Sequence, residues 1–591
     1  MNSKKNLKRN LLICLLAGSA VMYTLPLHAA TSVIGNGTLP SGGHFVTGGN
    51  DSNIVTGNNG LQMDITQSKN NAVITWKDFN VGGSATVNFW GPENHNTLNY
   101  VNGGNMSQIY GTINANNNGN IFIVNPAGVQ IGNSAQINVG SLYVSNKKFS
   151  DDELKKVKAD TNVNDFMQGG TLTNAELMSL GNINITNIEN GNVTFEGNGR
   201  IVIDTERIKK NDVVTDNFIV KTDDVNDVLL GYDAYNTGAI KNTYAGKDKT
   251  FNDNVLVNGQ KPTEAVKGYM WVEDVKQLQA IDTNLGGNYA LRNSIDGTQA
   301  NNFTSIGSNT AFSGKFDGID YNIFNLNISG KDNVGLFGET NGATINNVTL
   351  VGGSITGTGS NVGAIVGNAN NTTLTNVVNS AAVSGNSNVG GIVGSATNTT
   401  VEDAINTGAI EGRVNTGGNG GINVGGLIGS MNSSHLIGNS YNLGDVSGDG
   451  YNVGGLVGSA LNSTIGNPSV VNDKPVENVE TVYNRMDVTG AYNVGGIVGN
   501  MVGSTVQNAE NSGTVLASGH YGGEYTFHTD YTNDNYSAGG SKTVSVNVAN
   551  VGGIAGTSSS STITDVLNTG DVSSSKVKEQ EQEQEYYAAG N

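Results

Sequence analysis

Apolar residues in the second half of the chain come in runs of two to four, and glycine or asparagine ends nearly every run. Valine and isoleucine dominate these runs, which is typical of strands. Glycine and asparagine tolerate a positive φ at tight bends, so long helices do not fit between such closely spaced breaks. The pattern therefore predicts short β-strands joined by tight turns.

One phrase, close to NVGGIVG, occurs seven times, and a second phrase, N-x-G-x-[IV], lies between the copies, as at Asn406–Ile410 and Asn511–Val515. Such recurrence is typical of stacked units that cannot bury their apolar faces alone. We therefore expect an all-β solenoid of parallel strands with valine and isoleucine inside and asparagines stacked in amide ladders. The alternative is a disordered glycine-rich tract, which the regular β-branched residues disfavour. The seven copies begin at Asn333, Asn361, Asn388, Asn423, Asn452, Asn493 and Asn550.

Composition narrows the class of protein. Charged residues make up 14% of the 591-residue chain and the formal net charge is −19, which argues against a nucleic-acid partner. The single cysteine, Cys14, lies in a leader-like segment, where Lys4 to Arg9 supply positive charge and Leu11–Val21 is apolar. We interpret residues 1–30 as a signal peptide, so the mature chain is expected to be exported without a disulfide.

The segment that follows resembles a known family. Six short motifs occur in the family's order: Trp76–Phe79, Val87–Phe89, Leu98–Val101, Ile109–Gly111, Asn120–Val129 and Val139–Leu142. Their succession resembles the haemagglutination-activity, or two-partner-secretion, domain of filamentous-haemagglutinin-like exoproteins. The chain departs from the family's Asn-Pro-Asn-Gly-Ile pattern at Ala127 and Val129, and it has no clear copy of the second Asn-Pro-Asn-Leu motif.

The resemblance implies a right-handed parallel β-helix at the cell surface of, or secreted by, a Gram-negative bacterium. It also implies a partner: an outer-membrane two-partner-secretion transporter whose periplasmic domains recognise the chain in transit. Asn125, Pro126 and Gly128 carry over as part of the secretion signal. The alternative is that they only shape a turn, because proline fixes φ, asparagine caps the bend and glycine accepts a positive φ. Both roles can coexist.

The predicted organisation has four parts: the signal peptide at 1–30, the secretion domain at 31–255, a junction at 256–330 and a repeat region at 331–591. The repeats resemble the GLUG motif of bacterial surface proteins. Ser150 to Glu153 is an S-x-x-E capping box that predicts a short surface helix. In the junction, one amphipathic helix is predicted from the spacing of Trp271, Val275, Leu278 and Ile281.

Aromatic residues gather in one excursion from the repeats. Rigid aromatics among small polar residues are typical of antibody contact loops. We therefore expect this loop to contact a host-cell glycan or receptor, and the alternative is a decorated loop without a ligand. Its aromatic residues are Tyr521, Tyr525, Phe527, Tyr531 and Tyr536.

Catalytic signals are weak throughout the sequence. It has no H-E-x-x-H and no G-x-S-x-G motif, so no catalytic residue, metal site or cofactor is predicted. Asp317 and Asp320 could suggest a metal site, but acidic turn residues are the simpler interpretation. The sequence thus predicts a secreted, rod-shaped, non-enzymatic adhesin. The alternative is the stalk of a contact-dependent toxin or protease whose active domain lies beyond residue 591.

Overall fold

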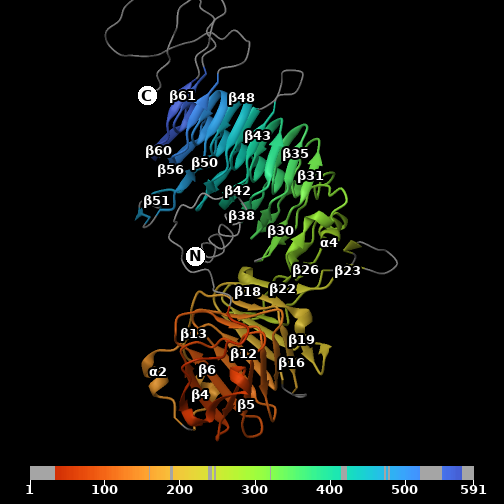
Figure 1. Cartoon of the computed structure of the whole chain (residues 1–591), viewed down its shortest axis with the longest axis vertical. Coiled ribbons are helices and arrows are strands. Elements are labelled where there is room, and N and C mark those ends of the chain that lie inside the picture. Colours follow the sequence, from red (N-terminus) through yellow and green to blue (C-terminus); the bar gives the residue numbers. More distant parts are fainter. Residues whose placement is uncertain are drawn as a thin grey trace, which may run out of the picture.

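The computed structural model describes residues 34–574, apart from 159, 187–190, 237–242, 245–247, 320, 414–421, 472–473, 477–478 and 519–548. Short strands stack on one another along the long axis of the molecule (Figure 1). Within these described residues no helix is long and apolar enough to cross a membrane. The predicted β-solenoid of stacked parallel sheets is confirmed.

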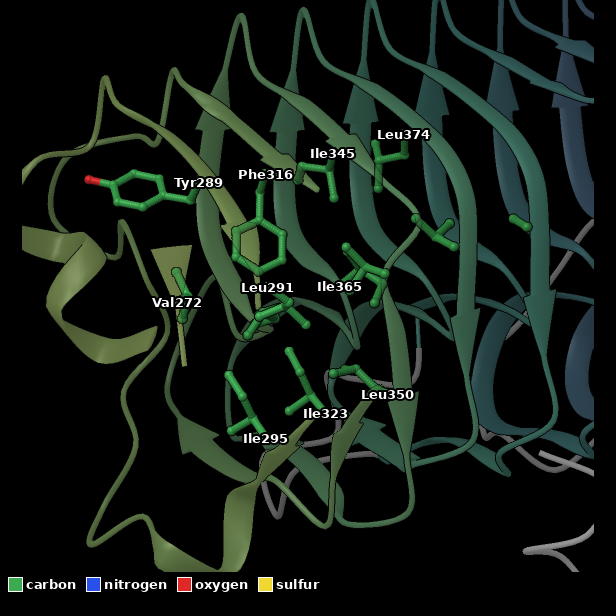
Figure 2. Packing of buried hydrophobic residues seen from close by; sticks show 14 of the residues in the cluster. Val272, Tyr289, Leu291, Ile295, Phe316, Ile323, Ile345, Leu350, Ile365 and Leu374 are labelled. Carbon is green, nitrogen blue, oxygen red and sulfur yellow. The ribbon is translucent and has the colours of Figure 1, made fainter. Parts of the chain in front are cut away.

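Equivalent side chains stack from one turn of the solenoid to the next. Tyr289 pairs in register with Phe316, Phe316 with Ile345, and Ile345 with Leu374. Figure 2 shows this row, together with neighbouring rows of aliphatic side chains inside the coil. Each row removes apolar surface from water, and this burial stabilises the fold by about 25 cal/mol for each Å² buried. The interior therefore forms one continuous hydrophobic core through the described chain.

Two sheets belong to the N-terminal half alone, and we call them sheets A and B. Each begins with one antiparallel pair, β1–β4 or β2–β3, which closes that end of the solenoid. Sheet A contains β1 (His44–Thr47), β4 (Asn71–Trp76), β6 (Asn96–Val101), β9 (Asn120–Val124), β12 (Ser141–Ser145), β17 (Val193–Glu196), β21 (Phe218–Thr222) and β25 (Val255–Val257). Sheet B contains β2 (Ile54–Gly57), β3 (Gln62–Thr66), β5 (Thr86–Trp90), β8 (Thr112–Ala115), β11 (Gln136–Val139), β16 (Asn182–Ile185), β19 (Ile208–Lys210) and β20 (Val213–Val214).

Sheet C runs through both halves of the molecule. Its long strands β38 and β42 join two parallel rows of shorter strands. The first row is β7 (Ser107–Ile109), β10 (Val129–Ile131), β15 (Leu177–Ser179), β18 (Ile201–Asp204), β22 (Val228–Tyr232), β26 (Tyr269–Val272), β27 (Asn288–Leu291), β29 (Lys315–Asp317), β33 (Thr344–Asn346), β38 (Thr373–Asn379), β42 (Thr400–Asn406), β46 (His435–Ile437), β50 (Thr464–Ile465), β56 (Thr505–Asn511) and β60 (Thr562–Asn568). The second row adds β28 (Ile295–Asp296), β30 (Asn322–Phe324), β34 (Thr349–Val351), β47 (Tyr441–Asn442) and β53 (Val482–Asn484).

Sheets D and E form the other walls of the repeat region. In each turn the chain passes from sheet C through sheet D and sheet E and back to sheet C. Sheet D contains β31 (Asn327–Gly330), β35 (Ser354–Gly357), β36 (Ser360–Gly363), β39 (Ala382–Gly385), β40 (Ser387–Gly390), β43 (Ile410–Gly412), β44 (Ile422–Gly425), β48 (Val446–Gly454), β54 (Val488–Gly495), β57 (Val515–Ala517), β58 (Val551–Gly552) and β61 (Val572–Ser574). Sheet E contains β32 (Phe337–Asn341), β37 (Val366–Asn370), β41 (Val393–Thr397), β45 (Ile428–Asn432), β49 (Val457–Leu461), β55 (Val498–Val502) and β59 (Ala555–Ser559).

An excursion from the N-terminal half covers the outer face of sheet A. It consists of β13 (Lys147–Lys148), α2 (Asp151–Lys155), α3 (Val163–Phe166) and β14 (Thr171–Leu172). The capping box predicted for α2 is confirmed, because the Ser150 and Glu153 side chains each accept the other residue's backbone N–H. Its apolar side chains bury an outward-facing cluster that is separate from the main core: Val73, Leu98, Tyr100, Phe122 and Val124.

The junction contains a shorter helix than the spacing predicts. The helix α4 spans Val275–Ala280 and continues as one 3-10 turn, Ile281–Thr283. The prediction that Trp271 belongs to this helix is wrong, because Trp271 lies on strand β26. Sheets A and B end before this point and sheets D and E begin after it, and the stack changes direction here (Figure 1).

Candidate functional site

The predicted secretion signal forms a tight turn after strand β9. Asn125 is 1% exposed. Its Nδ2 donates to the Asn105 carbonyl oxygen at 2.8 Å and to Ser107 Oγ at 2.9 Å, and its Oδ1 accepts the Ala127 N–H at 2.9 Å. The polar atoms of this side chain are thus occupied inside the domain.

The next residues present backbone rather than polar side chains. Pro126 and Ala127 are half-buried, and the Thr173 hydroxyl donates to the Pro126 carbonyl oxygen at 2.6 Å. Gly128 has a φ of +107°, and a β-carbon there would lie 2.6 Å from the Glu176 carbonyl oxygen. Glycine is therefore required at this position for conformation as well as for space. Only Pro126 and Ala127 of this turn are accessible to another molecule.

In the repeat region, the asparagine that opens each NVG phrase forms a side-chain ladder, which we call the corner ladder. In every step the Nδ2 of the later asparagine donates to the Oδ1 of the earlier one at 2.8–2.9 Å. The first six members have φ between +49° and +62°, a conformation that asparagine tolerates better than most residues. The ladder joins Asn333, Asn361, Asn388, Asn423, Asn452, Asn493 and Asn550, so the predicted amide ladder is confirmed.

The asparagine of the second phrase forms another ladder, which we call the core ladder. Here the earlier Nδ2 donates to the later Oδ1, at 2.7–2.9 Å, so the bonds run in the opposite direction. Each of these side chains also donates to the carbonyl oxygen two residues ahead, as Asn442 does to Gly444 at 2.8 Å. The core ladder consists of Asn379, Asn406, Asn442, Asn484, Asn511 and Asn568, and its first five members are fully buried.

The core ladder explains the second glycine of most NVGG phrases. A β-carbon on Gly455 would lie 2.1 Å from the Gly496 carbonyl oxygen and 2.4 Å from Cγ of Asn484. The same close approach to a core-ladder asparagine recurs at Gly391, Gly426, Gly496 and Gly553. The two phrases therefore recur together because the glycine of one packs against the asparagine of the other.

The predicted contact loop lies outside the described residues. Its aromatic residues, which are therefore not described either, are Tyr521, Tyr525, Phe527, Tyr531 and Tyr536. The structure does describe both roots of this loop. They are strands β57 and β58, and both pair with β54. On β54, the ring of Tyr492 stacks on Tyr451 of the preceding turn at a centroid distance of 5.0 Å. One ring of a stacked tyrosine pair thus lies on the strand that pairs with both roots of the loop.

The side chains that could bind a metal ion or take part in catalysis are dispersed over the described part of the chain. Across the described part of the chain, no three His, Cys, Asp or Glu side chains lie close enough together to hold a metal ion. His95 is fully buried between Gly91 and Gly119, and its Nδ1 is 2.9 Å from the Pro92 carbonyl oxygen. Burial lowers the pKa of this imidazole below its usual 6.5. The arrangement indicates a neutral structural histidine.

Sequence reasoning missed a cluster of buried charges on the outer face of sheet C. Asp204, 1% exposed, accepts hydrogen bonds from Arg292 at 2.8 Å and from the Trp271 indole at 3.1 Å. Arg200 lies 2.7 Å from Asp317, which shares no local motif with it. No sequence pattern predicts which of these distant residues pair. Arginine is rare in this chain, so each arginine is at most a candidate for a buried ion pair.

Comparison with known proteins places the N-terminal half. A family model described as the TPS secretion domain matches residues 37–303. The match runs past residue 255, where the motif pattern placed the end of this domain.

Two relatives share parts of the chain. It is 31% identical over 210 residues to a heme/hemopexin-binding protein of Haemophilus influenzae, covering 35% of this chain and 18% of that protein. It is 35% identical over 167 residues to halomucin of Haloquadratum walsbyi, covering 25% of this chain and 2% of that protein. The chain thus spans less than a fifth of the length of these relatives.

Two solved structures show more distant similarity. The HMW1 secretion domain of Haemophilus influenzae aligns with 80% of this chain and 95% of its own, at 13% identity and a TM-score of 0.21. A Bacteroides ovatus structure named for an immunoglobulin A1 protease aligns with 51% of this chain and 84% of its own, at 16% identity and a TM-score of 0.33. The secretion-domain match and the Haemophilus relative together support a two-partner-secretion exoprotein, and we call the matched residues 37–303 the secretion domain.

Proposed function

We propose that the chain is a rod-shaped surface adhesin, exported when the periplasmic domains of an outer-membrane transporter recognise its secretion domain. The match of residues 37–303 to the TPS secretion domain carries this proposal. The repeat region would serve as a spacer that presents contact loops at a distance from the cell. Repeated weak contacts made together then add avidity.

The described residues support a non-enzymatic role. The polar groups that recur in the repeat region bond to one another in the two ladders. A catalytic group, in contrast, needs a perturbed environment and access to substrate at one place. The regular ladders instead favour a structural repeat whose ligands bind at its excursions.

The role of the turn at Pro126 in export can be tested directly. Asn125 is buried, so we expect the turn to act through its shape and through the half-buried Pro126 and Ala127. In a strain that has the transporter, Pro126→Ala should reduce release into the medium several-fold and leave the chain in the periplasm, as immunoblots of the two fractions would show. Pro92→Ala, at another half-buried proline of the domain, is the control. Normal release of Pro126→Ala would remove this turn from the export signal.

We propose that the predicted contact loop, which lies in the sequence between Ala517 and Val551, contacts the receptor. Deleting residues 520–540 should abolish binding to host cells or to a glycan array, while secretion and circular dichroism stay unchanged. Deleting residues 414–421, which lie in the sequence between strands β43 and β44, is the matched control. Host-cell binding that survives the loop deletion would rule out the contact role.

The stalk of a toxin or protease is the alternative. A pure stalk needs only length, so replacing the excursions of the repeat region with short turns would leave its activity intact. An adhesin would lose host-cell binding in the same variant. The reading frame after residue 591 gives an independent test, because an active domain there would favour the stalk.

A further inference from the structure

Asp317, the last residue of β29, is at the centre of a contact between the two halves of the molecule. Its Oδ1 accepts from Arg200 Nη2 at 2.7 Å and from the Ile319 N–H at 2.7 Å. Asn347 Nδ2 lies 3.1 and 3.2 Å from its two carboxylate oxygens. Arg200 belongs to the secretion domain, whereas Asp317 and Asn347 lie beyond its matched end.

This contact does not follow from strand pairing. Arg200 immediately precedes β18, and β18 is separated from β29 by β22, β26 and β27 in sheet C. Neighbouring strands lie about 4.8 Å apart, so a flat sheet would hold these two residues far beyond salt-bridge distance. Sheet C must therefore bend so that the outer face at β29 approaches β18, which agrees with the change of direction in Figure 1.

Apolar side chains accompany the ion pair. Ile319, 1% exposed, belongs to a cluster that is separate from the main core, and Tyr321 packs against this cluster. Met178, Val202 and Leu229 alternate along their strands with residues of the main core, so they point to the outer face. The full cluster is Met178, Leu180, Val202, Leu229, Trp271, Ala290 and Ile319.

We propose that Asp317, Ile319 and Tyr321 form a latch that fixes the direction in which the repeat region leaves the secretion domain. The ion pair and the apolar contact act at the same place and join β18 to the segment that follows β29, in addition to their connection through sheet C and the main core. The molecule is then a rigid elbow rather than two rods on a hinge. This inference does not depend on what the protein binds.

Burial makes the latch sensitive to single substitutions. The Arg200 and Asp317 side chains are 15% and 11% exposed. Removing one partner takes the 2.7 Å ion pair away from the other buried charge, which is more disruptive than losing an exposed pair. Opening the latch hydrates the remaining charge. We expect this gain to exceed the cost of exposing the apolar cluster to water.

Spin labels can report the elbow, because the chain has no cysteine after Cys14. Labels at Asn133→Cys and Thr373→Cys, both exposed, lie in the secretion domain and the repeat region. In the secreted chain we expect a narrow distance distribution by double electron–electron resonance. Asp317→Ala and Arg200→Ala should each broaden it, and cleavage by protease between residues 303 and 315 should become at least about tenfold faster.

Two further variants complete the test. Arg413→Ala breaks an exposed ion pair with Glu411 inside the repeat region and should leave the distance distribution narrow. The charge-reversed pair, Arg200→Asp with Asp317→Arg, should recover much of the narrow distribution even if a single variant folds poorly. Distributions and cleavage rates that stay as in the parent chain after Asp317→Ala would overturn the latch, and so would a reversed pair no better than either single reversal.

Discussion

The secretion domain and the repeat region use one architecture but specify it in different ways. In the repeat region the same asparagines and glycines perform the same task in turn after turn, as in the corner and core ladders. In the secretion domain most turns have their own solution, such as the Asn125 turn or the His95 ring enclosed by two glycines. An interaction that repeats in every turn can be predicted from the sequence, whereas an interaction that occurs once is seen only in the structure.

The difference between repeated and individual interactions also determines how far the effect of a substitution extends. A ladder asparagine is bonded to the turns on both sides, so its loss disturbs two neighbours. The secretion domain does contain a ladder, through Asp64, Asn88, Asn114, Asn138 and Asn184, but these side chains are only half-buried. Substitutions at equivalent ladder positions should therefore lower the free energy of unfolding more in the repeat region than in the secretion domain.

The largest effect is expected where backbone packs on backbone. Gly455→Val places a β-carbon 2.1 Å from the Gly496 carbonyl oxygen, so adjacent turns must separate, at a cost of about 4 kcal/mol or more. Gly57→Val, in the secretion domain, meets no atom within 4 Å and should cost well under about 1 kcal/mol. Urea unfolding followed by circular dichroism checks both. Equal midpoints for the two variants would contradict the close packing.

The two ladders can be compared by single deletions. Asn442→Ala leaves Asn406 without its 2.9 Å acceptor and Asn484 without its 2.8 Å donor, all fully buried, so we expect a loss of about 3 kcal/mol. Asn114→Ala removes two similar bonds at a half-buried site and should cost about 1 kcal/mol. Hydrogen exchange measures the local opening free energy of each ladder. Equal losses would show that burial does not set the difference.

Acid should weaken the secretion domain through His95. Because burial lowers the pKa of His95 in the folded state, the unfolded state binds more protons below about pH 6.5, and stability falls as the pH decreases from there. We expect the thermal midpoint of this domain to drop between pH 7.5 and 5 in the parent chain, and to drop less in His95→Asn. His435→Asn, at an exposed ring of the repeat region, is the control. An unchanged pH slope in His95→Asn would remove this residue as the cause.

The smallest effect expected is a gain. Asn376 donates to Asn347, but its Oδ1 is buried and has no hydrogen-bond partner among the described residues. In the next turn Asp403, 2% exposed, occupies the equivalent position and cannot donate as a carboxylate. Asp403→Asn should supply the missing donor and stabilise the repeat region by about 1 kcal/mol.

The reverse change supplies the control. Asn376→Asp places two carboxylates in adjacent turns and should destabilise the repeat region, and hydrogen exchange would detect both shifts. The Asp403 carboxylate accepts the Asn439 N–H at 2.8 Å, and a loss of stability in Asp403→Asn would mean that this bond contributes more than the ladder.

The repeat region could be predicted from sequence because its interactions are periodic. The seven-fold recurrence of Asn-Val-Gly predicted the stacked strands and also the amide ladder that joins Asn333 to Asn550. The capping box at Ser150 was equally legible, because both partners lie within one helical turn.

The junction could not be predicted in the same way. Trp271 has helical spacing from Val275, yet it lies on a strand, where its indole donates to Asp204. Arg200 and Asp317 are 117 residues apart and share no pattern. Such contacts depend on how far sheet C curves, and no local propensity encodes that curvature.

The opposed directions of the two ladders have a consequence for long molecules of this kind. In the corner ladder every amide oxygen faces the following turn, whereas in the core ladder every amide oxygen faces the preceding one. Aligned dipoles in a single file would add up with length and leave partial charge at both ends. Two antiparallel files cancel instead, so adding turns lengthens the shaft without polarising it.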